Sequence, residues 1–133
     1  MNGVLSQTQQ HLIRDLQVAA RGPKRNGLFA VWLFVRVCDG MLPPEPLSEK
    51  AHRRRLDGLK RRLSSLSLPP SLKRALTGSW RELEAGTADA AALGLRQMVA
   101  PVREVLGSNL ADSLLCAARA AEESTAGTSA GKP

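Results

Sequence analysis

Apolar residues recur along most of the chain at intervals of three and four positions, with polar and charged residues between them. This spacing puts the apolar side chains on one face of an α-helix, whereas a half-buried strand would alternate at every second position. The sequence shows no such alternation. The pattern therefore predicts amphipathic helices over residues 4–20, 48–66, 70–86, 87–106 and 108–122.

One segment differs from these stretches because it is apolar almost throughout. Residues 28–37 read Leu-Phe-Ala-Val-Trp-Leu-Phe-Val-Arg-Val and hold both phenylalanines and one of the two tryptophans. Such a segment must be hidden from water on nearly all sides, so we expect it to form a central helix over about residues 25–39. Trp32 and Trp80 are both expected on faces that point into the core.

Glycine, proline and hydroxyl residues separate the predicted helices. Ser48 and Thr87 are suitable N-caps, because their side-chain oxygens can accept a hydrogen bond from a free backbone amide of the first turn. Pro101 should kink or split its helix. We predict an all-α fold: a compact bundle of five or six short helices around the central helix, in a single domain over residues 1–122. Residues 123–133 have little to bury and should form a disordered tail.

The charge of the chain is concentrated in its middle. The net charge is +7, but residues 21–81 hold 14 basic and 4 acidic residues, whereas residues 82–133 hold 4 basic and 7 acidic ones. An excess of this size attracts anionic partners without identifying them.

Most of the basic residues in this middle part fall in two of the predicted helices. A basic face of this kind is often only a solvated helix surface. As a binding surface it predicts an acidic protein or another polyanion as partner, with nucleic acid as an alternative because lysine and arginine contact phosphates. No helix-turn-helix signature or glycine-rich phosphate loop accompanies it. The predicted face consists of Arg53, Arg54, Arg55, Lys60, Arg61, Arg62, Lys73 and Arg74.

A second candidate site is polar. Arg36 and Asp39 are three positions apart on the central helix, a spacing at which two side chains can meet, although Arg36 could instead reach water or a carbonyl near the helix end. His52 falls within the apolar stripe of the next helix, which is more typical of a core histidine than of a ligand. No spacing of metal ligands or of a catalytic triad is present, so we expect no metal, no cofactor and no enzymatic activity.

Phe34, Arg36 and Asp39 form the pattern Phe-x-Arg-x-x-Asp within an aromatic helix. This pattern resembles the first aspartate-rich helix of the squalene and phytoene synthases, over residues 28–63 at most. The resemblance implies an all-helical protein that binds a prenyl diphosphate, in that family through magnesium held by further aspartates. Here Gly40 follows Asp39, a second aspartate-rich helix is absent, and the chain is about half as long as such an enzyme. The resemblance therefore implies a truncated or non-catalytic relative without the metal site.

The sequence also bears on the compartment. The apolar segment of ten residues begins too late for a secretory signal and is shorter than the roughly 20 residues that a membrane-spanning helix needs. Cys38 and Cys116 lie among apolar neighbours, which favours two small buried thiols in a reducing compartment over an internal disulfide. We therefore expect a cytoplasmic protein without a membrane span.

These observations favour a small basic helical protein that acts by non-covalent association, as a regulatory or assembly partner of an acidic macromolecule. Nucleic-acid binding through the same basic helices is the first alternative. Binding of a prenyl diphosphate, as the resemblance implies, is the second.

Overall fold

The computed structural model describes residues 5–19, 22–42 and 46–130. These ranges contain helices and turns but no strand, which confirms the predicted all-α class. The helices are α1 (Ser6–Val18), α2 (Pro23–Asp39), α3 (Glu49–Ser65), α4 (Pro70–Gly78), α5 (Trp80–Ala85), α6 (Ala88–Leu106) and α7 (Ser108–Ala130).

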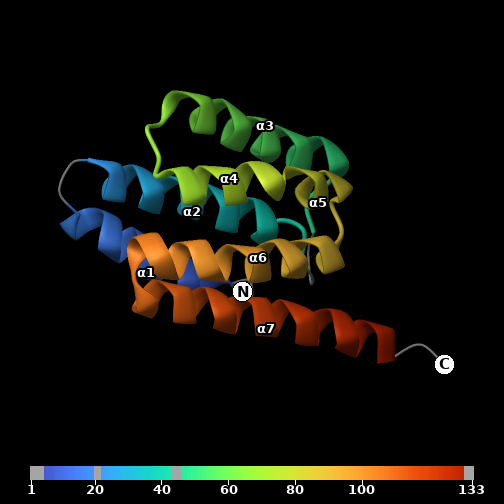
Figure 1. Ribbon diagram of the computed structural model, residues 1–133. Helices are drawn as coiled ribbons and strands as arrows, with labels where there is room; N and C mark the ends of the chain where they lie inside the picture. Colours follow the sequence, from blue (N-terminus) through green and yellow to red (C-terminus); the bar gives the residue numbers. More distant parts are fainter. Residues whose placement is uncertain (1–4, 20–21, 43–45, 131–133) are drawn as a thin grey trace.

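Helices α2 and α6 together form the centre of the bundle. Helix α2 packs against α1, α3 and α6, while α6 also packs against α4, α5 and α7. Figure 1 shows α3 along one edge of the molecule and α7 along the opposite edge, with the other helices between them. The inner face of α2 presents Leu28, Val31, Phe34, Val35 and Cys38, each at most 1% exposed. The central position predicted for this helix is confirmed, and α6 shares it.

Local sequence signals set the helix ends as predicted. The Ser48 side chain accepts a hydrogen bond of 3.2 Å from the Ala51 amide at the start of α3. Thr87 accepts a bond of 3.1 Å from the Ala90 amide at the start of α6. Each cap satisfies a backbone donor that the first helical turn leaves free.

The helix expected over residues 70–86 is interrupted at Ser79, so that it forms α4 and α5. The Ser79 hydroxyl donates a hydrogen bond of 2.9 Å to the Ala75 carbonyl one turn earlier. Serine bonded in this way tends to bend a helix. The backbone bonds continue across the interruption, from the Leu83 amide to the Ser79 carbonyl at 3.1 Å. The two short helices therefore correspond to one predicted element.

Two features of the C-terminal half differ from expectation. Helix α6 is not split at Pro101, which lies inside it between the buried side chains of Met98 and Val102. Helix α7 continues to Ala130, beyond residue 122, where the folded domain was expected to end. Residues 131–133 of the predicted tail lie outside the described residues, and the domain boundary stays a prediction.

The two cysteines lie in different environments, and both thiols are free. Cys38 is fully buried on α2, as predicted. Cys116 is exposed, so the prediction that both thiols are buried is wrong for this residue. Cys116 lies on the outer side of α7, whose inner side is formed by Leu114 and Ala117.

Candidate functional site

The outer face of α2 carries a stripe of basic and aromatic side chains. Arg25, Phe29, Trp32 and Arg36 follow one another at steps of four, three and four residues, which places them along one line of the helix surface. Phe29 and Trp32 are only partly buried, and their rings stack with centroids 5.9 Å apart and planes at 25°. The expectation that the central helix is hidden on nearly all sides is therefore wrong for this face, and Trp32 lies at the edge of the core.

Two arginines lie over this aromatic pair. The Arg36 guanidinium carbon is 5.0 Å from the centroid of the Trp32 ring, and that of Arg62, from α3, is 5.9 Å from the centroid of the Phe29 ring. Cations at such distances are attracted by the ring faces, by about 0.5–1 kcal/mol at exposed sites. The contacts hold Arg36 and Arg62 near each other across the boundary between α2 and α3.

Next to the aromatic pair, a small cavity of about 240 Å³ lies between α2 and α3. Arginine side chains make up half of its lining residues, and Leu33 and Leu59 line it as well. Within the described part of the chain, no carboxylate lines it and its arginines form no ion pair. We call it the arginine pocket, after Arg36, Arg54, Arg55 and Arg62.

Arg55 is the most firmly held member of the arginine pocket. Its Nη1 donates a hydrogen bond of 2.9 Å to the carbonyl oxygen of Arg36. Burial, and then the positive charge of Arg36, lower the pKa of Arg55 below its ordinary value, while Asp39 acts in the opposite direction. Cations are thus held close together here, so an added anion would be attracted.

Arg36 and Asp39, whose spacing would allow them to meet, take different partners. Arg36 lies over Trp32, while Asp39 Oδ2 accepts a hydrogen bond of 3.2 Å from the Gln9 side chain of α1. Asp39 thereby joins the C-terminal end of α2 to α1. Arg36 is left available to the arginine pocket.

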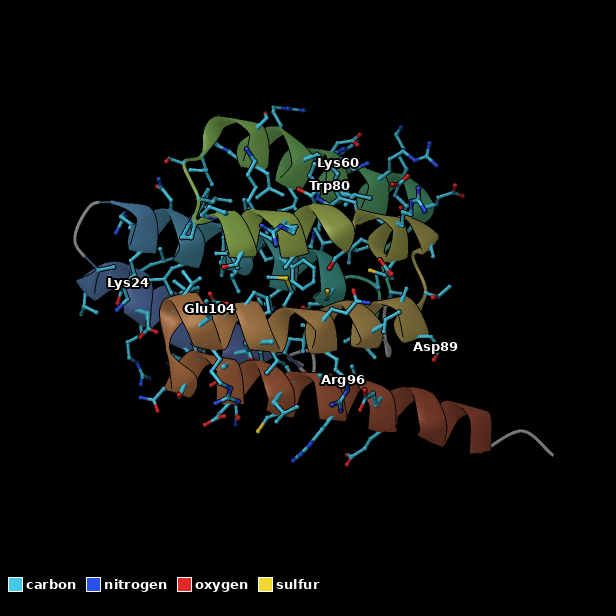
Figure 2. The ribbon with its side chains drawn as sticks, in the orientation of Figure 1. Lys24, Lys60, Trp80, Asp89, Arg96 and Glu104 are labelled. Atoms are coloured by element: carbon cyan, nitrogen blue, oxygen red, sulfur yellow. The ribbon has the colours of Figure 1, made fainter. Side chains whose placement is uncertain are left out.

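The remaining residues of the predicted basic face do not converge on this pocket. Arg53 is 3.4 Å from Glu49, and Lys60 is 3.6 Å from Glu84 and lies over the Trp80 ring at 5.4 Å. Figure 2 shows Lys60 beside Trp80, where α3 meets α5. These ion pairs neutralise the side of α3 that carries Arg53 and Lys60. Three further basic residues are exposed on α3 and α4, namely Arg61, Lys73 and Arg74.

His52, also predicted as a site residue, behaves as a core histidine. It is 8% exposed, and its Nε2 donates a hydrogen bond of 2.6 Å to the Leu83 carbonyl. The bond ties α3 to α5. The surrounding hollow is lined by acidic and basic side chains in similar numbers, so it has no preference for an anion.

A second hollow adjoins the aromatic pair on its other side, between α1 and α2. This groove has a volume of about 540 Å³ and is lined mainly by apolar side chains, with Arg25 as its charged residue. Arg25 Nη1 donates a hydrogen bond of 2.6 Å to the Leu16 carbonyl, which fixes the cation at the rim. We call this hollow the aromatic groove; it is formed by Ile13, Leu16, Gln17, Arg25, Asn26, Phe29 and Trp32.

The sequence contained a signal for this surface that the prediction missed. The steps of four, three and four from Arg25 to Arg36 mark one helix face, and this face combines cations with aromatic rings. The near-continuous apolar run around it concealed the pattern, since every face of the segment looked suitable for burial.

The resemblance to the prenyl-diphosphate enzymes can be compared with this geometry. Phe34 is fully buried on the opposite face of α2 from Arg36, and Asp39 is engaged by Gln9. Among the residues that the structure describes, no three histidine, cysteine or acidic side chains lie close enough to hold a metal ion. In the same ranges, no helix combines the length and apolar character needed to cross a bilayer. Comparison of the chain with protein-family models, curated proteins and solved structures gives no match.

Proposed function

We propose that the protein acts by non-covalent association with an acidic macromolecule, which docks on the arginine pocket. The observation that carries this proposal is that four arginines from α2 and α3 line one pocket, while no carboxylate among the described residues lines it. The sequence placed these groups in two separate candidate sites, the polar site at Arg36 and the basic face of α3.

The chemistry of the pocket favours carboxylate or phosphate groups. Guanidinium groups donate in a planar fork that matches the two oxygens of such anions, and these charge-assisted bonds are stronger than neutral ones. Burial and, after it, repulsion by Arg36 lower the pKa of Arg55, and an arriving anion relieves the repulsion. Leu33 and Leu59, which also line the pocket, contribute apolar surface that reduces competition from water.

A regulatory or assembly role in the cytoplasm fits this mode of action. The two free thiols, Cys38 and Cys116, are compatible with a reducing compartment. No step of this proposal requires a chemical reaction or a cofactor.

Nucleic acid is the second candidate, because bases stack on aromatic side chains that lie beside cations. The pair of Phe29 and Trp32 next to the arginine pocket is such an arrangement. However, Arg36 and Arg62 lie over these two rings, so a base would first have to displace them. An acidic protein needs no such rearrangement.

Charge reversal tests the proposal. The double variant Arg54→Glu and Arg62→Glu should bind poly-L-glutamate at least about tenfold more weakly, because two contacts worth roughly 0.7 kcal/mol each are lost. The matched control is Arg81→Glu with Arg119→Glu, which changes the net charge equally at two exposed positions outside the pocket. Fluorescence anisotropy at several salt concentrations measures both affinities, and circular dichroism confirms that each variant is folded.

Equal weakening in the test and control variants would show that only the net charge matters, and the arginine pocket would then be rejected as the docking site. A parallel titration with oligothymidylate examines the second candidate. Stronger binding of this oligonucleotide than of poly-L-glutamate, lost in the same variant, would favour nucleic acid as the partner.

A further inference from the structure

We infer that the acidic partner presents an amphipathic helix, whose apolar side chains enter the aromatic groove while its carboxylates reach Arg25, Arg36 and Arg62. This inference rests on the proposed function and specifies the form of the partner. It follows from the way in which the aromatic groove and the arginine pocket adjoin each other.

The two hollows share a boundary, which consists of two contacts between an arginine and an aromatic ring. Trp32 and Phe29 line the aromatic groove, and the arginines that lie over them, Arg36 and Arg62, line the arginine pocket. Arg25 also lines the groove, and on α2 it lies at the opposite end of the series from Arg36. The combined surface is therefore an apolar strip with cations at both ends. A ligand complementary to it must be apolar along one face and acidic at its margins.

The dimensions of the strip fit a short helix. Arg25 and Arg36 are eleven residues apart on α2, which corresponds to roughly 16 Å along the helix axis, or about three turns. A partner helix of that length presents anchors at positions i, i+3 or i+4, and i+7 on one face. Acidic residues beside these anchors would then lie opposite the arginines.

The groove is too open to enclose a small molecule. Its α1 wall includes Ile13, which is 42% exposed, and the rings on the α2 wall are partly exposed as well. Sites for small ligands bury most of the ligand surface, whereas an open apolar groove accepts side chains that a larger partner holds in place. A second macromolecule would also cover Ile13, which is otherwise one of the most exposed large apolar residues described.

Tryptophan fluorescence provides a direct test. The chain has two tryptophans, so the variant Trp80→Phe leaves Trp32, which lines the groove, as the reporter. Two synthetic peptides of equal negative charge serve as probes. The first is a glutamate-rich helix with leucines at i, i+3, i+4 and i+7, and the second carries glutamine in place of each leucine. We expect the first peptide to shift the Trp32 emission and to bind at least about tenfold more tightly, since burial of even one leucine suffices for that ratio.

A matched pair of variants locates the binding. Ile13→Gln removes apolar surface from the groove, and Leu93→Gln makes the same type of change on α6 at a residue of similar exposure, 46% against 42%. Ile13→Gln should weaken binding of the leucine peptide severalfold, while Leu93→Gln should leave it unchanged.

The possible outcomes separate this inference from the proposed function. If both peptides bind equally and Ile13→Gln has no effect, the partner is acidic but not amphipathic, and the inference is overturned while the proposed function stands. If neither peptide binds at low salt, both are overturned. If oligothymidylate shifts the Trp32 emission and binds more tightly than the leucine peptide, the groove serves nucleic acid and the inference is again rejected.

Discussion

The close approach of α2 and α6 depends on a glycine, and this leads to a stability prediction with an internal control. A Cβ atom built on Gly94 would lie 3.2 Å from Phe34 Cζ and 3.7 Å from Leu83 Cδ2. Gly58 lies within α3, and a Cβ atom there would meet nothing within 4 Å. The same change to alanine should therefore have different effects at the two positions.

The magnitudes follow from two terms. Alanine is a better helix former than glycine by about 0.8–1 kcal/mol, a gain that applies at both positions. At Gly94 the added methyl group crowds the ring of Phe34, which is fully buried and cannot turn aside into solvent. Overpacking of this kind costs about 1–3 kcal/mol. Gly58→Ala should raise the free energy of unfolding by up to about 1 kcal/mol. The free energy of unfolding of Gly94→Ala should be lower than that of Gly58→Ala by about 1–3 kcal/mol.

Urea denaturation followed by circular dichroism measures both values. A third variant identifies the cause: Phe34→Leu removes the ring atom nearest to the new methyl group, so in that background Gly94→Ala should cost less than in the natural chain. Such a change in cost is the signature of two residues in contact. If Gly94→Ala and Gly58→Ala raise stability equally, or if Phe34→Leu leaves the cost of Gly94→Ala unchanged, the packing of α2 on α6 described above is wrong.

Three further predictions concern the reactivity of the thiols, the pH dependence of stability and a helix cap. Iodoacetamide should label exposed Cys116 in the folded protein but label Cys38 only on unfolding, as mass spectrometry can measure. Burial, and then Asp39, raise the pKa of Cys38, so the folded state holds this proton more tightly. The protonated Cys38 thiol should therefore contribute fully to stability below the ordinary thiol pKa of about 8.5, and this contribution should be lost as the pH rises above that value. Thr87→Ala should lower the free energy of unfolding by about 1 kcal/mol, because the Ala90 amide loses its acceptor, whereas Thr87→Ser should retain most of it.

Most of the fold could be predicted because helix formation leaves a strong periodic signal. The stripe of Leu56, Leu59 and Leu63 is buried as its spacing indicated, and His52 within it is buried too. The break at Ser79 could not be read in this way, since the apolar spacing continues across it from Leu76 to Leu83. Its cause is a single side-chain bond to the backbone, which has no periodicity.

The candidate site was less predictable, because it depends on which helices become neighbours. The basic residues of α3 point to two sides of that helix. The i,i+4 spacing of Glu49 and Arg53 could be read from the sequence, but the pairing of Lys60 with Glu84 from α5 could not. The sequence also does not reveal that α2 brings Arg36 to the other side. Periodicity assigns a residue to a face, whereas tertiary packing decides what that face meets.

The outer face of α2 remains the strongest argument for a partner. Aromatic residues make up only 3% of the chain, yet Phe29 and Trp32 are only partly buried, and Trp32 packs against the edge of the core. Full burial of such a side chain is worth about 1.5–3 kcal/mol, so the exposed part of each ring leaves some of this unrealised, and the contacts with Arg36 and Arg62 replace only a fraction of that remainder. A fold selected for stability alone would place aliphatic or polar residues there. Their position is understandable if a second molecule completes their burial, as we propose, and the cations around them favour an acidic surface on that molecule.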